Sequence, residues 1–220
     1  MISFKDVSYC PHGQGKKKTL LFDKVSFSIG RGERVAVLGN RGVGKSALLN
    51  MLAGKIRPDS GDMCINGHMS MPLGQSWGVH PTLTGRQNMR FLIRLRGLEP
   101  SMREITEDFE NFSELGALFD KPVASYPSAL KTRFYQSLFF TIPSDFYICD
   151  ATLGAGDERF KERAATRLKT SLGGCGIFLA HPNEKIIREF CSVALVISGK
   201  KISYFESMDS AYDCLKDGAK

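Results

Sequence analysis

The residues best suited to chemistry lie in the stretch from Gly39 to Ser46, GNRGVGKS, which has the spacing G-x-x-x-x-G-K-[ST]. Its glycines permit a tight turn, so that successive backbone N–H groups point at the oxygens of bound phosphates. We expect Lys45 to reach the terminal phosphates and the Ser46 hydroxyl to ligate magnesium. The predicted phosphate site comprises Gly39, Asn40, Arg41, Gly42, Val43, Gly44, Lys45 and Ser46.

The flanks of this stretch support the same interpretation. The apolar run RVAVL before it is typical of a strand buried on both faces, and SALLNMLAG after it has helical spacing and ends at Gly54. A helix that begins at the turn adds partial positive charge where the phosphates would lie. The alternative, a purely structural Gly-rich turn, does not require these flanks.

A second candidate is Asp150, at the end of the apolar run FYIC. A carboxylate at the end of a strand can support the magnesium ion held by Ser46. Many aspartates in such places only cap the following turn. The presence of a phosphate-binding stretch earlier in the chain favours the metal role.

The remaining pattern indicates an α/β fold, a P-loop NTPase core with a β subdomain and a helical insert. Strand-like runs occur at ISFKDVSY, LLFDKVSFSI, RVAVL, DFYICD, GIFLAH and ALVISG, and PDSGDMCINGH is typical of a loop and a short strand. Helical spacing dominates from about 82 to 141 and returns in ERFKERAATRLKTSL and NEKIIREFC. We therefore expect one domain over 1–220, with a core of parallel strands formed by 1–74 and 143–220, and an insert over about 75–142.

Composition adds few constraints. The chain has 220 residues, 42% of them hydrophobic and 24% charged, as in ordinary globular proteins. Its six cysteines lack metal-ligand spacing, and no apolar run approaches a membrane span, so we expect a cytosolic chain with free thiols. The net charge of +7 is spread along the sequence, so we expect solvated faces and no nucleic acid partner.

Several further stretches resemble the ATP-binding subunits of ABC transporters. The segment QSWGVHPTLTGRQNM resembles the Q-loop region, His181 in FLAHP resembles the switch histidine, and no NKxD guanine-recognition string occurs. The resemblance implies that Gln75 contacts magnesium and the attacking water, that His181 contacts the γ-phosphate, and that Tyr9 stacks on adenine. It also implies ATP and Mg²⁺ as cofactors, with Ser46, Asp150 and Gln75 around the metal.

The resemblance narrows to the subunits that power export of capsular and related surface polysaccharides in Gram-negative bacteria. It is carried by LTGRQNMRFLIRLRGL, FSELGALFDKPVASYPS, TLGAGDERFKER and IREFCSVALVISGKKISYF, and covers nearly the whole chain. It implies a transmembrane permease partner, two ATP-binding subunits arranged head to tail, and a peripheral place on the cytoplasmic face of the inner membrane. The polysaccharide would be handled by the complex and not bound by this chain.

The chain departs from the family at the signature motif, expected within SYPSALKTRF. Pro127 replaces a serine and has neither a hydroxyl nor a backbone N–H, so two donors to the opposing γ-phosphate are missing. Ala129 adds a Cβ where the family has glycine. Ser128 could substitute for the missing donor if the loop shifts by one residue.

The second departure is Ala151, where the family has a glutamate that orients the attacking water. A methyl group cannot do this, and general-base assistance is typically worth about 10² to 10⁴ in rate. We expect ATP binding to survive, with His181 and Gln75 organising water only weakly and hydrolysis slow. Asp157, at the family's D-loop position, is expected to structure the subunit interface and not to replace the base.

Several alternatives stay open on sequence alone. The chain could be a regulatory or structural ATP-binding subunit with little turnover, or an ABC-type ATPase that acts on nucleic acid. It could form a homodimer, or a heterodimer in which the partner's complete site does the hydrolysis. Phe91, Leu92 and Leu95 could line a groove for the permease or pack the insert's own core.

Overall fold

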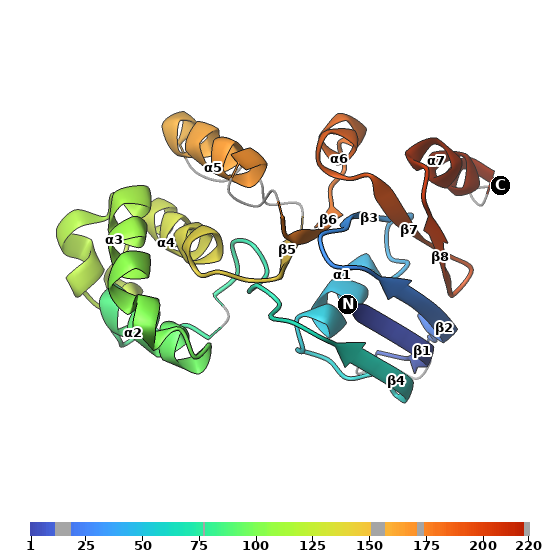
Figure 1. The fold of residues 1–220 in the computed structure, drawn as a ribbon, viewed down its shortest axis with the longest axis horizontal. Coiled ribbons are helices and arrows are strands. Elements are labelled where there is room, and N and C mark those ends of the chain that lie inside the picture. Colours follow the sequence, from blue (N-terminus) through green and yellow to red (C-terminus); the bar gives the residue numbers. More distant parts are fainter. Residues whose placement is uncertain (12–18, 77, 151–156, 171–173, 218–220) are drawn as a thin grey trace. The chain divides into compact units, whose positions relative to one another are not determined.

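The computed structural model describes residues 1–11, 19–76, 78–150, 157–170 and 174–217. These residues divide into two compact units. The first contains the described residues within Met1–Ser70, Ser144–Ala151 and Leu172–Lys220, and the second those within Met71–Pro143 and Thr152–Ser171. Figure 1 labels the helices and strands of both units.

The first unit begins with an antiparallel sheet of three strands in the order β2-β1-β4. These are β1 (Ile2–Tyr9), β2 (Phe22–Ile29) and β4 (Ser60–Ile65). In β2 buried and more exposed positions alternate, as expected for a sheet with one covered face. Figure 1 shows the three strands side by side.

A second sheet of five strands, in the order β5-β6-β3-β7-β8, carries the predicted phosphate stretch. Its strands are β3 (Arg34–Leu38), β5 (Phe146–Asp150), β6 (Gly176–Ala180), β7 (Val193–Ser198) and β8 (Lys201–Phe205). The first four run parallel, and β8 pairs antiparallel with β7. Because β3 and β5 are parallel to β6, their carboxyl ends meet at one edge of the sheet.

Helix α1 (Lys45–Leu52) joins the two sheets into one hydrophobic core. Leu48, Leu49, Met51 and Leu52 are buried on it together with side chains from both sheets. Helix α6 (Glu184–Phe190) precedes β7, and α7 (Met208–Asp217) packs on β7.

The second unit is helical. It contains α2 (Gly85–Leu95), α3 (Met102–Ser113), α4 (Ser128–Thr141) and α5 (Glu158–Thr170), with short 3₁₀ turns η1 (Glu99–Ser101), η2 (Gly116–Asp120) and η3 (Val123–Ser125). Its core is rich in aromatic rings: Phe109 stacks on Phe119 at 4.8 Å and meets Phe134 edge-on at 5.6 Å. Such ring pairs add to the hydrophobic contribution of burial.

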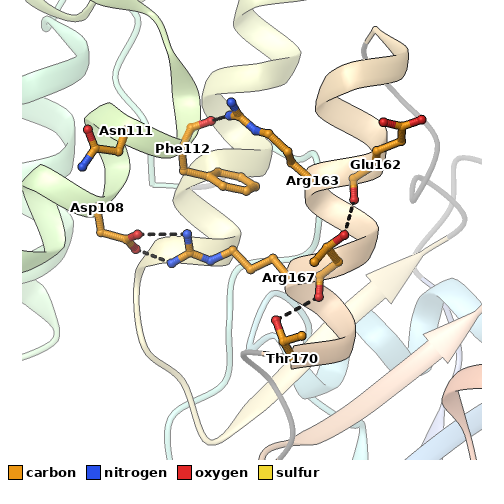
Figure 2. Close-up of a pocket in the computed structure, with 8 residues that line it drawn as sticks. Asp108, Asn111, Phe112, Glu162, Arg163, Arg167 and Thr170 are labelled. Carbon is orange, nitrogen blue, oxygen red and sulfur yellow. Dashed lines mark hydrogen bonds and ion pairs between the residues drawn. The ribbon is translucent and has the colours of Figure 1, made fainter.

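Arginines attach α5 to α3 within this unit. The guanidinium of Arg167 donates to both carboxylate oxygens of Asp108, and Arg163 donates to the backbone oxygen of Phe112 (Figure 2). The Arg167 guanidinium also lies 4.8 Å from the ring centre of Phe112. Bidentate pairs of this kind fix orientation as well as adding energy, so α5 is held in a defined position on α3.

The α/β class and the predicted strands and helices agree with the structure. Two elements, β8 and α7, were not predicted, and β8 makes the second sheet mixed where parallel strands alone were expected. Across the described part of the chain, none of the helices has both the length and the hydrophobicity that a membrane crossing requires.

Candidate functional site

The stretch from Gly39 to Ser46 forms the turn between β3 and α1, as predicted. Gly44 is the N-cap of α1 and adopts a left-handed conformation with φ 111°. A Cβ at this position would also lie 3.0 Å from the ring of Phe22. The left-handed backbone therefore favours glycine here, and a Cβ would fit only if the Phe22 ring moved by a few tenths of an ångström. The Gly44 oxygen accepts the first helical hydrogen bond, from the Leu48 N–H at 2.9 Å.

Lys45 is the first residue of α1, and its ammonium group lies over the turn. Nζ donates to the backbone oxygens of Gly39 at 2.5 Å and Asn40 at 2.8 Å. Partial burial lowers the pKa of Lys45. A cation held at the start of a helix, next to N–H groups without helical partners, makes this end of α1 strongly attractive to phosphate.

Ser46 and Asp150 lie together, although 104 positions separate them in the sequence. The Ser46 hydroxyl lies 3.4 Å from Oδ2 of Asp150. Asp150 ends β5, and Ser46 occupies the first turn of α1, so the strand order and the P-loop turn bring them to the same sheet edge. Both are hard oxygen ligands of the kind that Mg²⁺ prefers.

His181 directly follows β6, at this same edge. Its Nδ1 accepts a hydrogen bond from the backbone N–H of Asn183 at 3.0 Å. In the neutral ring Nε2 then carries the proton and can donate to an oxygen. Asn183 is also the N-cap of α6, where its side chain accepts from the Lys185 N–H at 2.9 Å, so the residue that orients His181 is itself fixed.

Several of the predicted residues share one cavity of about 770 Å³ in the first unit. Gly39, Asn40, Arg41, Lys45, Asp150 and His181 line it, which brings together three separately predicted parts of the site. Sequence reasoning missed Glu184, Ile187, Tyr212 and Leu215, which also line it. Helix-start signals could have located two of its walls: the Asn-Glu pair at the start of α6, and Ser207 with Asp209 at the start of α7.

Tyr9 lies at the end of β1, where the adenine-stacking residue was expected. Its side chain is 8% exposed, and its ring lies 6.4 Å from that of Phe22 on the neighbouring strand. The ring thus contributes to the hydrophobic core, and its contact with adenine stays a prediction.

Gln75 belongs to the second unit, in the segment before α2, where its backbone N–H donates to Pro72 at 3.2 Å. Its proposed contact with magnesium and water stays a prediction.

The turn expected to carry the signature motif lies at the start of α4. Pro127 is the N-cap and Ser128 the first helical residue, and both are exposed. Ser128 and the next residues supply backbone N–H groups that lack partners within the helix, whereas Pro127 has none to offer. The Ser128 position is therefore compatible with the predicted substitute donor, and that role remains a prediction.

Asp157 has two structural partners. One carboxylate oxygen accepts from the Phe160 N–H at 2.9 Å, and the other accepts from Arg133 on α4. The hydrogen bond from Phe160 and the charge of Arg133 lower the pKa of Asp157. This agrees with a structural role for Asp157. Ala151, at the position of the missing glutamate, lies outside the described residues.

Phe91, Leu92 and Leu95 of α2, which were considered for the permease groove, have different surroundings. Leu92 is buried in the core of the helical unit, which agrees with the second of the two alternatives, packing of the insert's own core. Phe91 is 51% exposed and Leu95 is 68% exposed. Arg90 and Arg94, on the same exposed side of the helix, accompany them.

Comparisons with known proteins agree with this geometry. A family model described as ABC transporter matches residues 22–133. The chain is similar to the polysialic acid transport ATP-binding protein KpsT of Escherichia coli, with 36% identity over 88% of this chain and 87% of that protein. It is also similar to the capsule polysaccharide export ATP-binding protein CtrD of Neisseria meningitidis serogroup B, with 31% identity over 97% of each chain.

Among solved structures, the ADP- and Pi-bound dimer of the ATP-binding cassette MJ0796 has a similar fold. The TM-score is 0.73, with 17% identity over 92% of this chain and 97% of that one. This structural match supports the fold, and the two sequence matches cover 88% and 97% of the chain. On these grounds the chain belongs to the ABC transporter family.

Proposed function

We propose that this chain is the ATP-binding subunit of a transporter that exports a capsular or related surface polysaccharide, and that it holds ATP firmly but hydrolyses it slowly. The observation that carries the proposal is the cavity lined by Gly39, Asn40, Arg41, Lys45, Asp150 and His181, with the Ser46 hydroxyl 3.4 Å from the Asp150 carboxylate. The substrate class comes from the names of the similar proteins, whose similarity covers most of this chain.

The donor set fits a magnesium–nucleotide complex. Ser46 and Asp150 would hold the metal, and the first turn of α1 with Lys45 would hold the phosphates. When bound, magnesium would neutralise charge on the phosphate oxygens. His181 would donate from Nε2 to the terminal phosphate, because Nδ1 is already occupied by Asn183.

Slow hydrolysis follows from the residues on either side of the shared site. Ala151 removes the general base, and Pro127 removes a hydroxyl and an N–H from the face that would meet the ATP of an opposing subunit. Asp157 does not offer a replacement base, because its carboxylate is occupied by Phe160 and Arg133. Positioning and charge neutralisation remain, and these dominate phosphoryl transfer.

The helical unit offers a surface for the permease. Phe91 and Leu95 are exposed one turn apart on α2, next to Arg90 and Arg94. An apolar pair flanked by cations suits a cytoplasmic helix of the permease that presents apolar and acidic residues. Through this contact the chain would be held at the cytoplasmic face of the inner membrane.

Pairing with a second ATP-binding subunit decides where turnover occurs. In a homodimer both sites would lack the glutamate and face Pro127. In a heterodimer with an intact subunit, the partner's P-loop would keep its base, and hydrolysis would occur there. A subunit with little turnover of its own fits the second arrangement.

The proposal is tested in the cell that produces the polysaccharide. Replacing the gene with one that encodes the Lys45→Ala variant should abolish surface polysaccharide. The wild-type chain should copurify with a multi-spanning membrane protein. Normal surface polysaccharide in the variant, with the protein present at wild-type level, would overturn the proposal. ATP turnover that nucleic acid stimulates in the absence of membrane would favour the nucleic-acid alternative.

A further inference from the structure

Within the helical unit, the entry to α2 is bound to the segment that leads into α4. Three backbone hydrogen bonds join the two segments, from Val123 to Leu83 at 3.0 Å, from Ala124 to Pro81 at 2.8 Å and from Gly85 to Lys121 at 3.3 Å. The segment that leads into α4, residues 121–126, continues directly into the turn Pro127–Leu130 that begins α4. These hydrogen bonds therefore connect that turn to Gly85, the first residue of α2.

Asn88 fixes the other segment, residues 80–84, which enters α2. Its side chain is fully buried, and its Oδ1 accepts from the His80 N–H at 2.7 Å. Its Nδ2 donates to the backbone oxygens of His80, Leu83 and Thr84 at 3.0 to 3.2 Å. The loop before α2 therefore moves with the second turn of that helix.

Gly85 leaves the space that the Tyr126 side chain fills between these two segments. Tyr126 is 4% exposed, and its ring meets Phe134 edge-on at 5.7 Å. A Cβ at Gly85 would lie 2.4 Å from the Tyr126 hydroxyl oxygen and 2.8 Å from Cδ2 of Phe119. Gly85 lies in a helical conformation that any residue can adopt, so packing alone demands glycine here.

We propose that the Gly85–Tyr126 contact couples α2 to the turn Pro127–Leu130, with Tyr126 as the positioning residue of that turn. The inference rests on the proposed function, in which α2 faces the permease and the turn faces ATP bound by the opposing subunit. Two backbone segments in hydrogen-bonded and van der Waals contact shift together, because packed interiors do not deform continuously. A displacement of Phe91 and Leu95 by the permease would thus move the nucleotide-facing turn.

The test uses the assembled complex in lipid vesicles. Association of the two ATP-binding subunits is followed by fluorescence energy transfer while ATP is titrated, with the permease present and absent. The ratio of the two ATP midpoints measures the coupling, for which factors of about 5 to 150 are typical. ATP binding by the isolated chain is measured separately.

We expect Gly85→Ala to bring the ratio of the two ATP midpoints close to one, while the isolated chain binds ATP as before. Tyr126→Phe in the Gly85→Ala background should restore part of the ratio, because it removes the atom nearest the new methyl group. Gly174→Ala is the matched control, since a Cβ there meets nothing within 4 Å and its backbone is not left-handed. A wild-type ratio in Gly85→Ala, or an equal loss in Gly174→Ala, overturns the inference.

If Gly85→Ala does not fold, Tyr126→Leu takes its place. A reduced ratio with unchanged ATP binding supports the proposal, and an unchanged ratio overturns it. The two proposals fail differently: a wild-type complex that does not bind ATP overturns the proposed function and the inference with it. A wild-type complex that binds ATP but shows no effect of the permease overturns the inference alone.

Discussion

The hydroxyl of Ser46 lies 3.4 Å from the carboxylate of Asp150, at the edge of the parallel strands where the Gly39–Ser46 turn lies. One residue comes from a helix start and the other from a strand end. The parallel pairing of β5 with β6, and of β6 with β3, brings these two ends together. This relationship places two oxygen ligands beside a phosphate-binding turn. The metal dependence of nucleotide binding therefore tests directly whether Ser46 and Asp150 hold magnesium.

Ser46→Ala should weaken magnesium-dependent ATP binding by about 10- to 100-fold or more, since even the loss of a residue that supports a metal ligand has effects of this size. Asp150→Asn should act in the same direction. Calorimetric titration with ATP, with magnesium and with a chelator, measures the effect. Unchanged magnesium dependence in both variants would show that neither side chain serves the metal. Ser60→Ala, on β4, is a suitable control.

Lys45→Ala should weaken ATP binding by about 10- to 150-fold, the range expected when one hydrogen bond to a charged oxygen is lost. The ammonium group is held over the turn by two backbone oxygens in the absence of nucleotide, so it is already in place. Fluorescent-nucleotide titration measures the change. Lys185→Ala is the control at an exposed position, and equal affinity in the two variants would contradict the role given to Lys45.

Pro127→Ser should lower the ATP concentration needed for subunit association by about tenfold or more, because the serine supplies both a hydroxyl and a backbone N–H to the opposing phosphate. Sedimentation in the presence of a non-hydrolysable ATP analogue measures association. Pro122→Ser, at another exposed helix start, controls for the loss of a proline ring. An unaltered midpoint for Pro127→Ser would mean that this turn does not face nucleotide.

The Asp157 carboxylate should make stability depend on pH. Its pKa is lowered by the hydrogen bond from Phe160 and by Arg133, so its contribution is present above the ordinary aspartate value of about 3.9 and is lost as pH falls through the lower folded value. Asp157→Asn retains an N-cap acceptor for α5 but removes the charge. Urea unfolding should therefore show wild type more stable at pH 7, with the difference shrinking toward pH 3. A difference that does not change with pH would contradict this assignment, and Asp62→Asn serves as the control.

Much of the site could be predicted because the phosphate-binding turn and Asp150 each have a local signal. GNRGVGKS combines a spacing with a strand before it and a helix after it, and Asp150 ends an uninterrupted apolar run. The pairing of Ser46 with Asp150 was predicted because an aspartate at the end of a strand can support the magnesium ion that the phosphate-binding stretch holds. His181 was identified only through the family resemblance, since a single histidine after a strand has no spacing to define it.

The remainder depends on contacts between distant residues. In β8 only Ile202 is well buried, so the strand lacks the apolar pattern that marks the central strands. The ring of Tyr9 is covered by Phe22, a neighbour created by the pairing of β1 with β2. Likewise the helix α5 was predicted, but its attachment through Arg163 and Arg167 to α3 arises from side chains 51 and 59 positions apart. Local periodicity contains no information about such pairs.

The central claim is that this chain holds ATP but splits it slowly because Ala151 stands where the family has its general base. The most direct measurement is single-turnover ATP hydrolysis by the purified chain and by Ala151→Glu, each with and without the membrane partner. We predict magnesium-dependent ATP binding by both proteins, with hydrolysis by the wild-type chain lower by roughly 10² or more. Wild-type hydrolysis at the rate of Ala151→Glu, and at the level ordinary for an ATPase, would contradict the account.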